Sequence, residues 1–514
     1  MLLRVLLLAI AASTVQFRNV ADHAGLNAVL DNGPTPEKHL IETMAGGVAA
    51  FDYDNDGRTD LLFTNGAGDP ALYRNLGGGR FENVTPGSGL TRAGYAIGVA
   101  AGDFDNDGNV DLFVAGVNRS TLYRNRGGHF EDAGLRVEGW AIAAGWFDFD
   151  KDGLLDLFVV RYVQWDPATE RACFDSSGKL RIFCHPRYYQ GLSNLLFRNR
   201  GNGTFEDVSE RSGIARHIGK GMSLAFADYD NDGFPDVFVT NDTQPNFLFH
   251  NRGNGTFEEV GLDAGAALLD HGKPVSSMGV DFRDYDNDGR ADLSLTALQG
   301  ETFPVFRNLG KGQFQDQTYA SHATPATIRY SGWANALLDF DNDGWKDLFF
   351  ATGHVTDNIE QFSGDKYKQA NVLLLNNRDG TFAPFTKAFP GERAHRGAAF
   401  ADFNGDGKLD IAVACLGDKP ELWENTTANA NHWLELKLTG TKSNRDGIGA
   451  KVTIGNQMQE YFTSFGYASS SHAGLHFGLG PVSLVPRIDI RWPSGVVQTL
   501  RDVPADRVLQ VREP

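Results

Sequence analysis

The chain has 514 residues and a formal net charge of −18 at pH 7. Hydrophobic residues make up 41% of it, which is enough for a sizeable core and excludes global disorder. The acidity excludes a general nucleic-acid-binding protein, because such a protein needs a basic face for phosphates. The length predicts either several domains or one large repeat architecture.

The N-terminus has the features of a secretory signal peptide. Arg4 precedes an apolar run from Val5 to Ala12 that ends in small residues. We expect residues 1–14 to be a signal peptide and the protein to be secreted, extracellular or periplasmic. The alternatives are a misassigned start codon and a frayed apolar tail. No later segment approaches 18 apolar residues, so no membrane span is expected.

A nine-residue pattern, D-x-[DN]-x-D-G-x-x-D, occurs seven times, starting at positions 52, 103, 148, 228, 284, 339 and 402. A small-residue apolar run precedes each copy, and a run rich in Phe, Leu and Val follows it. A glycine-rich hairpin such as 72–84 comes next in the first six repeats. Each repeat therefore predicts four short antiparallel strands. Seven such repeats predict an all-β chain with a seven-bladed β-propeller.

The two ends of the repeat region complement each other. The last repeat stops after its third strand, at residues 421–425, whereas residues 17–20 match the fourth strand of the first repeat, residues 81–84. We therefore expect the N-terminal strand to close the seventh blade, which removes exposed strand edges. The propeller is expected to span residues 15–427.

The pattern changes after the repeats. Apolar and polar residues alternate without acidic loops, as in residues 433–438 and 487–492. This alternation predicts a small β-sandwich-like domain over residues 428–514.

The acidic loops carry the clearest chemistry in the sequence. Several carboxylates in a compact loop repel one another unless a cation compensates them. Oxygen ligands at positions 1, 3, 5 and 9, with a backbone carbonyl at position 7, suit Ca²⁺, and up to seven ions are expected. An EF-hand is excluded because its position 12 needs a glutamate and here position 12 is apolar, as at Phe63. Mg²⁺ is the less suitable metal, and the alternative without a metal is a set of solvated acidic turns.

The expected side-chain ligands are Asp52, Asp54, Asp56 and Asp60; Asp103, Asp105, Asp107 and Asp111; Asp148, Asp150, Asp152 and Asp156; Asp228, Asp230, Asp232 and Asp236; Asp284, Asp286, Asp288 and Asp292; Asp339, Asp341, Asp343 and Asp347; and Asp402, Asn404, Asp406 and Asp410. The seventh set has one carboxylate fewer, so its site is expected to bind the ion more weakly.

An insertion of roughly residues 161–191 lengthens the third repeat. It contains Cys173 and Cys184, which lie eleven residues apart and could form one disulfide. The third cysteine, Cys415, lies in an apolar run and is expected to be a buried thiol.

The loops and hairpins resemble the FG-GAP or VCBS repeats of integrin-α-like seven-bladed propellers over roughly residues 16–425. The C-terminal segment resembles the ASPIC/UnbV domain at residues 444–452, 466–469, 476–480 and 492–495. The combination is similar to the cartilage acidic protein/UnbV-like family of secreted proteins. This resemblance implies calcium and extracellular binding or adhesion, and it implies no known reaction.

The insertion belongs to the same resemblance. Paired cysteines at Cys173 and Cys184, with His185-Pro186 and Tyr188, are similar to those of bacterial members of the family. The resemblance thus implies a disulfide between the two cysteines.

The long connections between strands indicate where a partner would bind. In such a repeat they all lie on the face opposite the acidic loops, and loops on a rigid scaffold carry most binding functions. The long connections are residues 161–192, 261–275, 318–331 and 353–371. The aromatic and basic candidates are Trp165, Arg187, Tyr188 and Tyr189. The alternative is that these residues only pack the insertion against its blade.

The sequence contains no nucleophile elbow, phosphate-binding loop, dinucleotide fingerprint or zinc signature. We therefore expect a secreted calcium-binding propeller that acts as a binding or adhesion module for an extracellular protein or glycan. One alternative is a polysaccharide lyase or hydrolase with its site at the propeller centre or on the loop face. Another is a purely structural matrix component.

Overall fold

The computed structural model describes residues 15–92, 94–385 and 387–514. The expected signal peptide, residues 1–14, lies outside the described residues. The all-β expectation is confirmed, because strands dominate and the helices are single turns. None of the helices in these described ranges is long and apolar enough to cross a membrane.

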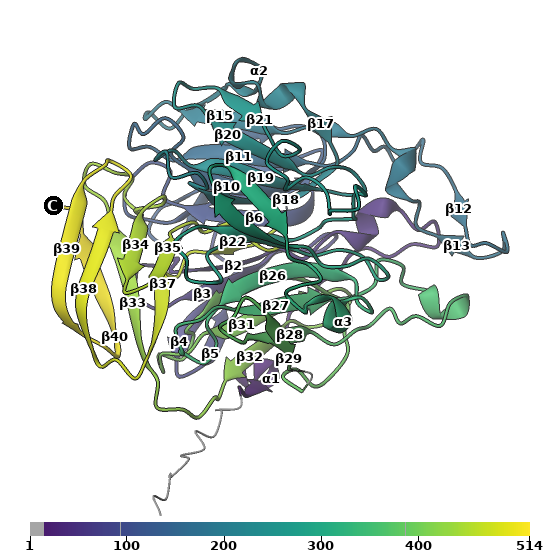
Figure 1. Cartoon of the computed structure of the whole chain (residues 1–514). Helices are drawn as coiled ribbons and strands as arrows, with labels where there is room; N and C mark the ends of the chain where they lie inside the picture. Colours follow the sequence, from purple (N-terminus) through teal and green to yellow (C-terminus); the bar gives the residue numbers. More distant parts are fainter. Residues whose placement is uncertain (1–14, 93, 386) are drawn as a thin grey trace, which may run out of the picture.

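Seven sheets of the described chain contain the predicted four antiparallel strands, in chain order in the first six (Figure 1). The first sheet has a fifth strand, β36 (Ser470–Ser471), parallel to its first strand. The first three sheets are β2 (Val48–Phe51), β3 (Asp60–Phe63), β4 (Ala71–Gly77) and β5 (Arg80–Asn83); β6 (Tyr95–Gly102), β7 (Asp111–Val117), β8 (Ser120–Asn125) and β9 (Phe130–Val137); and β10 (Ala141–Phe147), β11 (Asp156–Arg161), β15 (Leu195–Asn199) and β16 (Phe205–Asp207).

The next three sheets are β18 (Gly221–Ala227), β19 (Asp236–Asn241), β20 (Phe247–Asn251) and β21 (Phe257–Glu259); β22 (Val280–Arg283), β23 (Asp292–Leu295), β24 (Val305–Gly310) and β25 (Gln313–Asp316); and β26 (Gly332–Leu338), β27 (Asp347–Thr352), β28 (Val372–Asn376) and β29 (Phe382–Pro384).

The last of the seven sheets combines both ends of the repeat region. It consists of β30 (His395–Ala401), β31 (Asp410–Cys415), β32 (Glu421–Asn425) and β1 (Phe17–Asn19). β1 runs antiparallel to β32, with Phe17 opposite Asn425. The N-terminal strand therefore takes the fourth position in this sheet.

The first strands of the seven sheets lie side by side. Each contacts the first strand of the following sheet, and β30 contacts β2. Most of these strands are rich in alanine and glycine and almost wholly buried, as in β10, where every residue is buried. Small side chains are needed here because the backbones approach closely. A Cβ added at Gly98 in β6 would lie 2.1 Å from the carbonyl oxygen of Ile142 in β10.

The C-terminal part forms two further sheets. One contains β33 (His432–Thr439), β37 (Leu475–Gly480) and β40 (Arg507–Arg512), and the other contains β34 (Lys451–Ile454), β35 (Gln457–Glu460), β38 (Leu484–Arg491) and β39 (Val497–Pro504). Buried Leu434, Leu436, Val452, Ile488 and Ile490 from both sheets belong to one apolar core. The two sheets thus share an apolar core.

One segment between these C-terminal strands lies among the repeats. Residues 461–471, called the central segment below, contain β36 (Ser470–Ser471), which pairs parallel with β2. Residues 461–470 are all buried. The sequence analysis assigned this segment to a separate domain and did not predict its position inside the repeat region.

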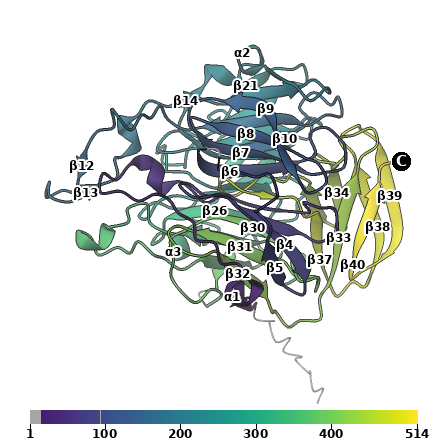
Figure 2. The same ribbon diagram turned by 180° about the vertical axis from the view of Figure 1, so that it is seen from behind.

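Short elements occupy the connections. They are α1 (Ala21–Ala24), η1 (Leu40–Thr43), β14 (Leu192–Ser193), α2 (Ser209–Ser212), η3 (Ile214–Arg216), β17 (Ile218–Gly219), α3 (Thr324–Thr327) and η4 (Ile359–Gln361). The insertion holds β12 (Cys173–Phe174), β13 (Arg181–Ile182) and η2 (Pro186–Tyr188). Two opposite views place β12 and β13 on the far side of the molecule from the C-terminal sheets (Figure 1 and Figure 2).

Candidate metal loops and a candidate binding pocket

The seven acidic loops share one backbone conformation. Position 4 has φ between 57° and 61° in the first six loops, at Asn55, Asn106, Lys151, Asn231, Asn287 and Asn342. Asparagine tolerates this left-handed region better than most residues, and glycine replaces it in the seventh loop, at Gly405. This requirement explains why asparagine and glycine recur at a position that supplies no predicted ligand.

The first and ninth carboxylates of each loop are fixed by backbone N–H groups. At position 1, Asp52 Oδ2 accepts a hydrogen bond from Gly57 N at 2.8 Å, and the equivalent distances in the other six loops are 2.7–3.0 Å. At position 9, Asp60 Oδ2 accepts from Tyr53 N at 2.9 Å, and its Oδ1 accepts from Asn75 N at 2.6 Å. The carboxylates are thus held in place by the fold itself.

The predicted ligands at positions 1, 3 and 9 converge. In each of the first three loops, one oxygen from each of the three carboxylates lies within 4.8 Å of the other two. These sets are Asp52, Asp54 and Asp60; Asp103, Asp105 and Asp111; and Asp148, Asp150 and Asp156. In the fourth loop, Asp230 and Asp232 gather with His250, which the sequence analysis did not list as a ligand.

The donor set fits a hard cation. The buried oxygens Asp105 Oδ1, Asp150 Oδ1 and Asp228 Oδ1 have no hydrogen-bond partner among the described residues. Burial and then neighbouring carboxylates raise the pKa of Asp148 to about 7, although hydrogen bonds from the loop backbone oppose the shift. For Asp111, burial raises the pKa to about 9. Acidic groups that are fixed, buried and close together are what a divalent cation with oxygen ligands requires.

A basic residue that the sequence analysis missed meets positions 3 and 5. Arg74 Nε lies 2.8 Å from Asp54 Oδ2, and Arg74 Nη2 lies 3.1 Å from Asp56 Oδ2. Equivalent contacts are made by Arg124 with Asp105, by Arg198 with Asp150 and Asp152, and by Arg307 with Asp286 and Asp288. Each of these four arginines lies in the third strand of its repeat and is followed by an asparagine. This recurring Arg-Asn pair is visible in the sequence and could have indicated the contact. The position 5 carboxylates are therefore shared with arginine, unlike those at positions 1 and 9.

The asparagine after this basic residue joins neighbouring sheets. Its side-chain Nδ2 donates to the carbonyl oxygen of position 2 in the preceding loop at 2.7–3.0 Å. The pairs are Asn125 to Tyr53, Asn199 to Phe104, Asn251 to Phe149, Asn308 to Tyr229, Asn376 to Tyr285, Asn425 to Phe340 and Asn75 to Phe403. The last of these bonds joins the first sheet to the seventh.

A pocket of about 480 Å³ lies beneath the insertion, on the side opposite the C-terminal sheets. Cys173 and Cys184, which line it, are joined by a disulfide with a Cα–Cα distance of 5.2 Å. The rest of its wall is formed by η1 with the following Met44 and by the ends of strands from the third to the sixth sheets. The disulfide therefore fixes the part of the chain that covers the pocket.

The four candidate partner residues separate into two pairs. Trp165 stacks edge-on against Trp140 at 5.8 Å, and Trp165 and Tyr189 are both partly buried against the main apolar core, so these two pack the insertion onto the sheets. Arg187 and Tyr188 are exposed and line the pocket. The packing alternative thus describes Trp165 and Tyr189, and the surface role remains open to Arg187 and Tyr188.

Comparison with known families places the repeats and the C-terminal part. The FG-GAP-like repeat family matches residues 52–114, 103–159, 174–239, 228–295, 284–350 and 339–413, which together are more than half of the chain. The chain belongs to the FG-GAP-like repeat family. The family described as ASPIC and UnbV matches residues 440–514. The resemblance stated from the sequence is confirmed.

Two curated relatives of this FG-GAP-like protein match it over most of its length and over about 70% of their own. Cartilage acidic protein 1 of Xenopus tropicalis is 26% identical over 501 residues, covering 88% of this chain and 71% of the relative. Its counterpart in Homo sapiens is 25% identical over 490 residues, covering 87% and 69%. Among solved structures, YCF48 from Cyanidioschyzon merolae has a TM-score of 0.43 at 11% identity, covering 79% of this chain and 98% of that one. We draw no functional argument from so distant a likeness.

In this FG-GAP-like protein the ASPIC and UnbV region covers the acidic-loop side. Asp446 Oδ2 accepts from Asp103 N at 2.8 Å, and Glu460 Oε2 accepts from Asp228 N at 2.8 Å. In the sixth loop, His476 Nε2 lies 2.8 Å from Asn342 Oδ1. The loop face is therefore an interface within the chain, and the opposite face is the one that carries the pocket.

The central segment extends this contact into the middle of the repeats. It bonds to or stacks on the first strands of six sheets, at Ala49, Val99, Ser223, Val280, Trp333 and Phe400. Tyr467, fully buried, packs edge-on against Trp333 at 4.9 Å and donates from its hydroxyl to Met44 O at 2.8 Å. Because Met44 and Trp333 line the pocket, the central segment reaches from the ASPIC and UnbV side to the pocket floor.

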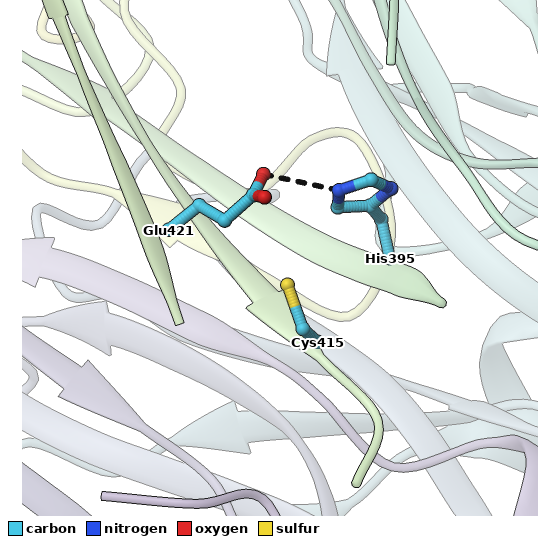
Figure 3. Close-up of side chains that lie close together, drawn as sticks. All are labelled: His395, Cys415 and Glu421. Carbon is cyan, nitrogen blue, oxygen red and sulfur yellow. Dashed lines mark hydrogen bonds and ion pairs between the residues drawn. The ribbon is translucent and has the colours of Figure 1, made fainter. Parts of the chain in front are cut away.

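A buried cluster of His395, Cys415 and Glu421 has metal-like composition (Figure 3). Its donor atoms are already used: His395 Nε2 pairs with Glu421 Oε2 at 3.0 Å, and His395 Nδ1 lies 2.7 Å from Thr352 O. Glu421 Oε1 accepts from Arg393 Nε at 3.0 Å. Burial raises the pKa of the Cys415 thiol well above its usual range, which keeps it protonated. We interpret the cluster as a buried ion-pair network, and Cys415 is buried as the sequence predicts.

Glu513 organises the loop that begins the ASPIC and UnbV match. Its Oε2 accepts from the backbone N–H groups of Thr441, Lys442 and Ser443 at 2.7, 2.7 and 2.9 Å. Partial burial opposes ionisation, but the hydrogen bonds from Ser443, Ser494 and their neighbours outweigh it and lower the pKa of Glu513 to about 2. The charged form is therefore the one that stabilises the fold.

Replacing Glu513 by Gln is expected to destabilise the C-terminal sheets by about 2 kcal/mol at pH 7, because hydrogen bonds to a charged acceptor are lost. Since the folded pKa lies below the unfolded value of about 4.3, the advantage of the wild type is complete above that value. It declines as the pH falls toward 2. Urea unfolding at pH 7 and pH 3 measures it, with exposed Glu138→Gln as the control. An equal deficit at both pH values would contradict the assignment.

Proposed function

We propose that this FG-GAP-like protein is a secreted, calcium-binding, seven-bladed propeller that acts as an extracellular binding module for a protein or a glycan. The observation that carries the proposal is the asymmetry of the two faces. The ASPIC and UnbV region occupies the acidic-loop face, whereas the opposite face presents long connections and the disulfide-held insertion. Rigid scaffolds with exposed loops on one face are suited to partner recognition.

The closed ring in this proposal is supported by the bonds between the first and last sheets. β1 completes the sheet of β30–β32, β30 contacts β2, and Asn75 donates to Phe403 O at 2.9 Å. We assign residues 15–427 to the ring and residues 428–514 to the second domain, whose central segment inserts into the first.

Calcium in this proposal is held by the position 1, 3, 5 and 9 side chains of up to seven loops. The ion would supply positive charge that neutralises carboxylates fixed close together. It therefore has a structural role, which makes the face bearing the pocket rigid. The seventh loop, with Asn404 in place of a carboxylate, would be the weakest site.

Secretion is supported by the disulfide between Cys173 and Cys184, since such bonds persist in oxidising compartments. Expression of the full chain and of a variant lacking residues 1–14 tests it. The full chain is expected in the culture medium or the periplasm and the shortened chain in the cytoplasm. Equal distribution of the two would contradict the signal peptide.

The binding role is tested with a glycan array and an extracellular protein array, both probed with the calcium-loaded protein. Replacing Arg187 and Tyr188 together by Ala is expected to reduce binding to any specific partner at least about tenfold, because exposed arginine and tyrosine often dominate interfaces. The matched control is Arg501→Ala with Val497→Ala, an exposed pair on β39. Undiminished binding by the Arg187 and Tyr188 variant would place the partner site elsewhere.

The enzymatic alternative placed its site at the propeller centre or on the loop face. The central segment fills the centre, where Phe465 stacks on Phe400 at 5.9 Å and Tyr467 is fully buried. For an enzyme, the loop face that carries the pocket would therefore be the place of the site. A purely structural matrix role would leave both arrays without a specific partner.

A further inference from the structure

We infer that the pocket beneath the insertion binds a small apolar molecule that carries one carboxylate, such as a short fatty acid. The apolar body would lie on the pocket floor and the carboxylate at the rim, under the insertion. Arg187 and Tyr188 belong both to the rim of this pocket and to the candidate partner surface. The small probes used below measure the pocket without a macromolecular partner, so this inference and the proposed binding role can fail independently. Its volume of about 480 Å³ lies within the range typical of small-molecule sites.

The floor is apolar and deformable. Met44, Met222 and Met278, three of the five methionines in the chain, line the pocket and are at most 4% exposed. Trp333 and Leu298 complete this surface. Methionine side chains are flexible and polarisable, and they adapt to apolar ligands of varied shape. Their concentration here, in a chain poor in methionine, distinguishes the floor from the phenylalanine-rich core of the sheets.

The rim is basic. Arg171 and Arg187 line the pocket and form no ion pair with a carboxylate among the described residues. Their guanidinium groups lie 3.9 and 5.5 Å from the centre of the Tyr188 ring, so both make cation–π contacts with the same ring. The three acids of the insertion accept hydrogen bonds within it: Asp166 from Ala168 N, Glu170 from the Tyr189 hydroxyl, and Asp175 from the backbone of its own turn. Unpaired arginines in a fixed position suit an anionic group, and a carboxylate matches their geometry.

The depth of the pocket sets the orientation of the ligand. Asp242 lines the inner wall, where its Oδ2 accepts a hydrogen bond from the Tyr162 hydroxyl at 2.6 Å. A buried carboxylate repels a second anion, so a ligand carboxylate is disfavoured at this end and favoured beside the arginines. The pocket is therefore acidic at its inner end, at Asp242, and basic at its rim, at Arg171 and Arg187.

The backbone beside Asp242 is strained. Thr243, which also lines the pocket, has φ of 60°. A β-branched residue rarely adopts this left-handed conformation, and such strain persists where the surrounding structure holds it for a functional reason. The strained turn places Asp242 N within 2.9 Å of Lys220 O and so fixes the acidic wall.

The test is a titration of the full, calcium-loaded protein with octanoate, octylamine and 1-octanol, three probes that share one chain and differ in charge. Calorimetry and intrinsic tryptophan fluorescence, to which Trp333 in the pocket contributes, report binding. Octanoate is expected to bind about tenfold more tightly than either other probe, the difference that one charge-assisted hydrogen bond supplies. No saturable binding of octanoate, or equal affinity for octanoate and octylamine, would overturn the inference.

Variants separate the rim from the floor. Arg171→Ala with Arg187→Ala is expected to reduce octanoate affinity about tenfold and to leave 1-octanol unchanged. Lys179→Ala, an exposed charge on the same insertion but outside the pocket, is the matched control. Met222→Trp is expected to abolish binding of all three probes. If that variant does not fold, the double arginine variant still tests the inference, because both residues are exposed and their replacement does not disturb the core. Unchanged octanoate affinity in the arginine pair would overturn the rim assignment.

Discussion

Removal of calcium is expected to lower the melting temperature of this protein by at least about 10 °C. A ligand at 100 times its dissociation constant adds about 2.7 kcal/mol to the native state at each site. In domains of 150–250 residues, 1 kcal/mol corresponds to about 2–4 °C. With several sites, the sum is large even if some are weak. The physical cause is the repulsion among carboxylates such as Asp103, Asp105 and Asp111, of which backbone N–H groups fix the first and the last.

Differential scanning calorimetry in EDTA, and in EDTA pre-saturated with calcium as the control, measures this effect. A site-level test follows from Asp105, whose buried Oδ1 has no partner in the described chain. Asp105→Asn is expected to reduce the number of calcium ions bound by one, whereas exposed Asp69→Asn leaves it unchanged. Identical melting in both EDTA samples would refute a structural role for calcium.

Deletion of residues 15–20 is expected to destabilise the whole repeat region, because it removes β1 and leaves the edge of β32 unpaired. A single substitution isolates the packing contribution. Phe17 contacts Phe340 and Phe389 at ring distances of 5.7 and 5.0 Å, so Phe17→Ala is expected to cost about 2–3 kcal/mol. Its neighbour Arg18 is 68% exposed in an ion pair with Glu424, so Arg18→Ala is expected to cost less than about 1 kcal/mol.

Urea unfolding followed by far-ultraviolet circular dichroism measures both substitutions. The decisive comparison is between the two adjacent positions on one strand, since both change the same segment and only Phe17 faces the sheets. Equal, small effects at Phe17 and Arg18 would mean that the N-terminal strand does not stabilise the ring. A deletion variant as stable as the wild type would lead to the same conclusion.

The repeated elements could be predicted because a few neighbouring residues determine each of them. Gly57 and its equivalents, with asparagine at position 4, specify the loop turn, and the glycine-rich hairpins specify the strands that follow. The roles of Arg74 and Asn75 were less accessible. Their spacing is visible in the sequence, but an asparagine that bonds to the preceding repeat looks the same as one that caps its own hairpin.

The central segment could not be predicted from the sequence. Residues 461–471 have neither the alternation of a strand nor the apolar run of a core element, and Ser469, Ser470 and Ser471 are typical of a loop. They are buried because the repeats supply partners for their polar groups: Ser471 Oγ accepts from Phe400 N at 3.0 Å and Ser470 Oγ from Ala101 N at 3.1 Å. The pocket was equally hidden, since its methionines are far apart in the chain.

The position of the central segment also constrains the order of assembly. β1 leaves the ribosome first, but its partner β32 ends only at Asn425, so the first and seventh sheets cannot join until most of the chain has been made. The central segment is synthesised later still. Both flanking strands, β35 and β37, lie in the C-terminal sheets, so the segment inserts among the repeats as a loop. The C-terminal part cannot dissociate without exposing this buried segment, so the two parts of the chain are expected to unfold together.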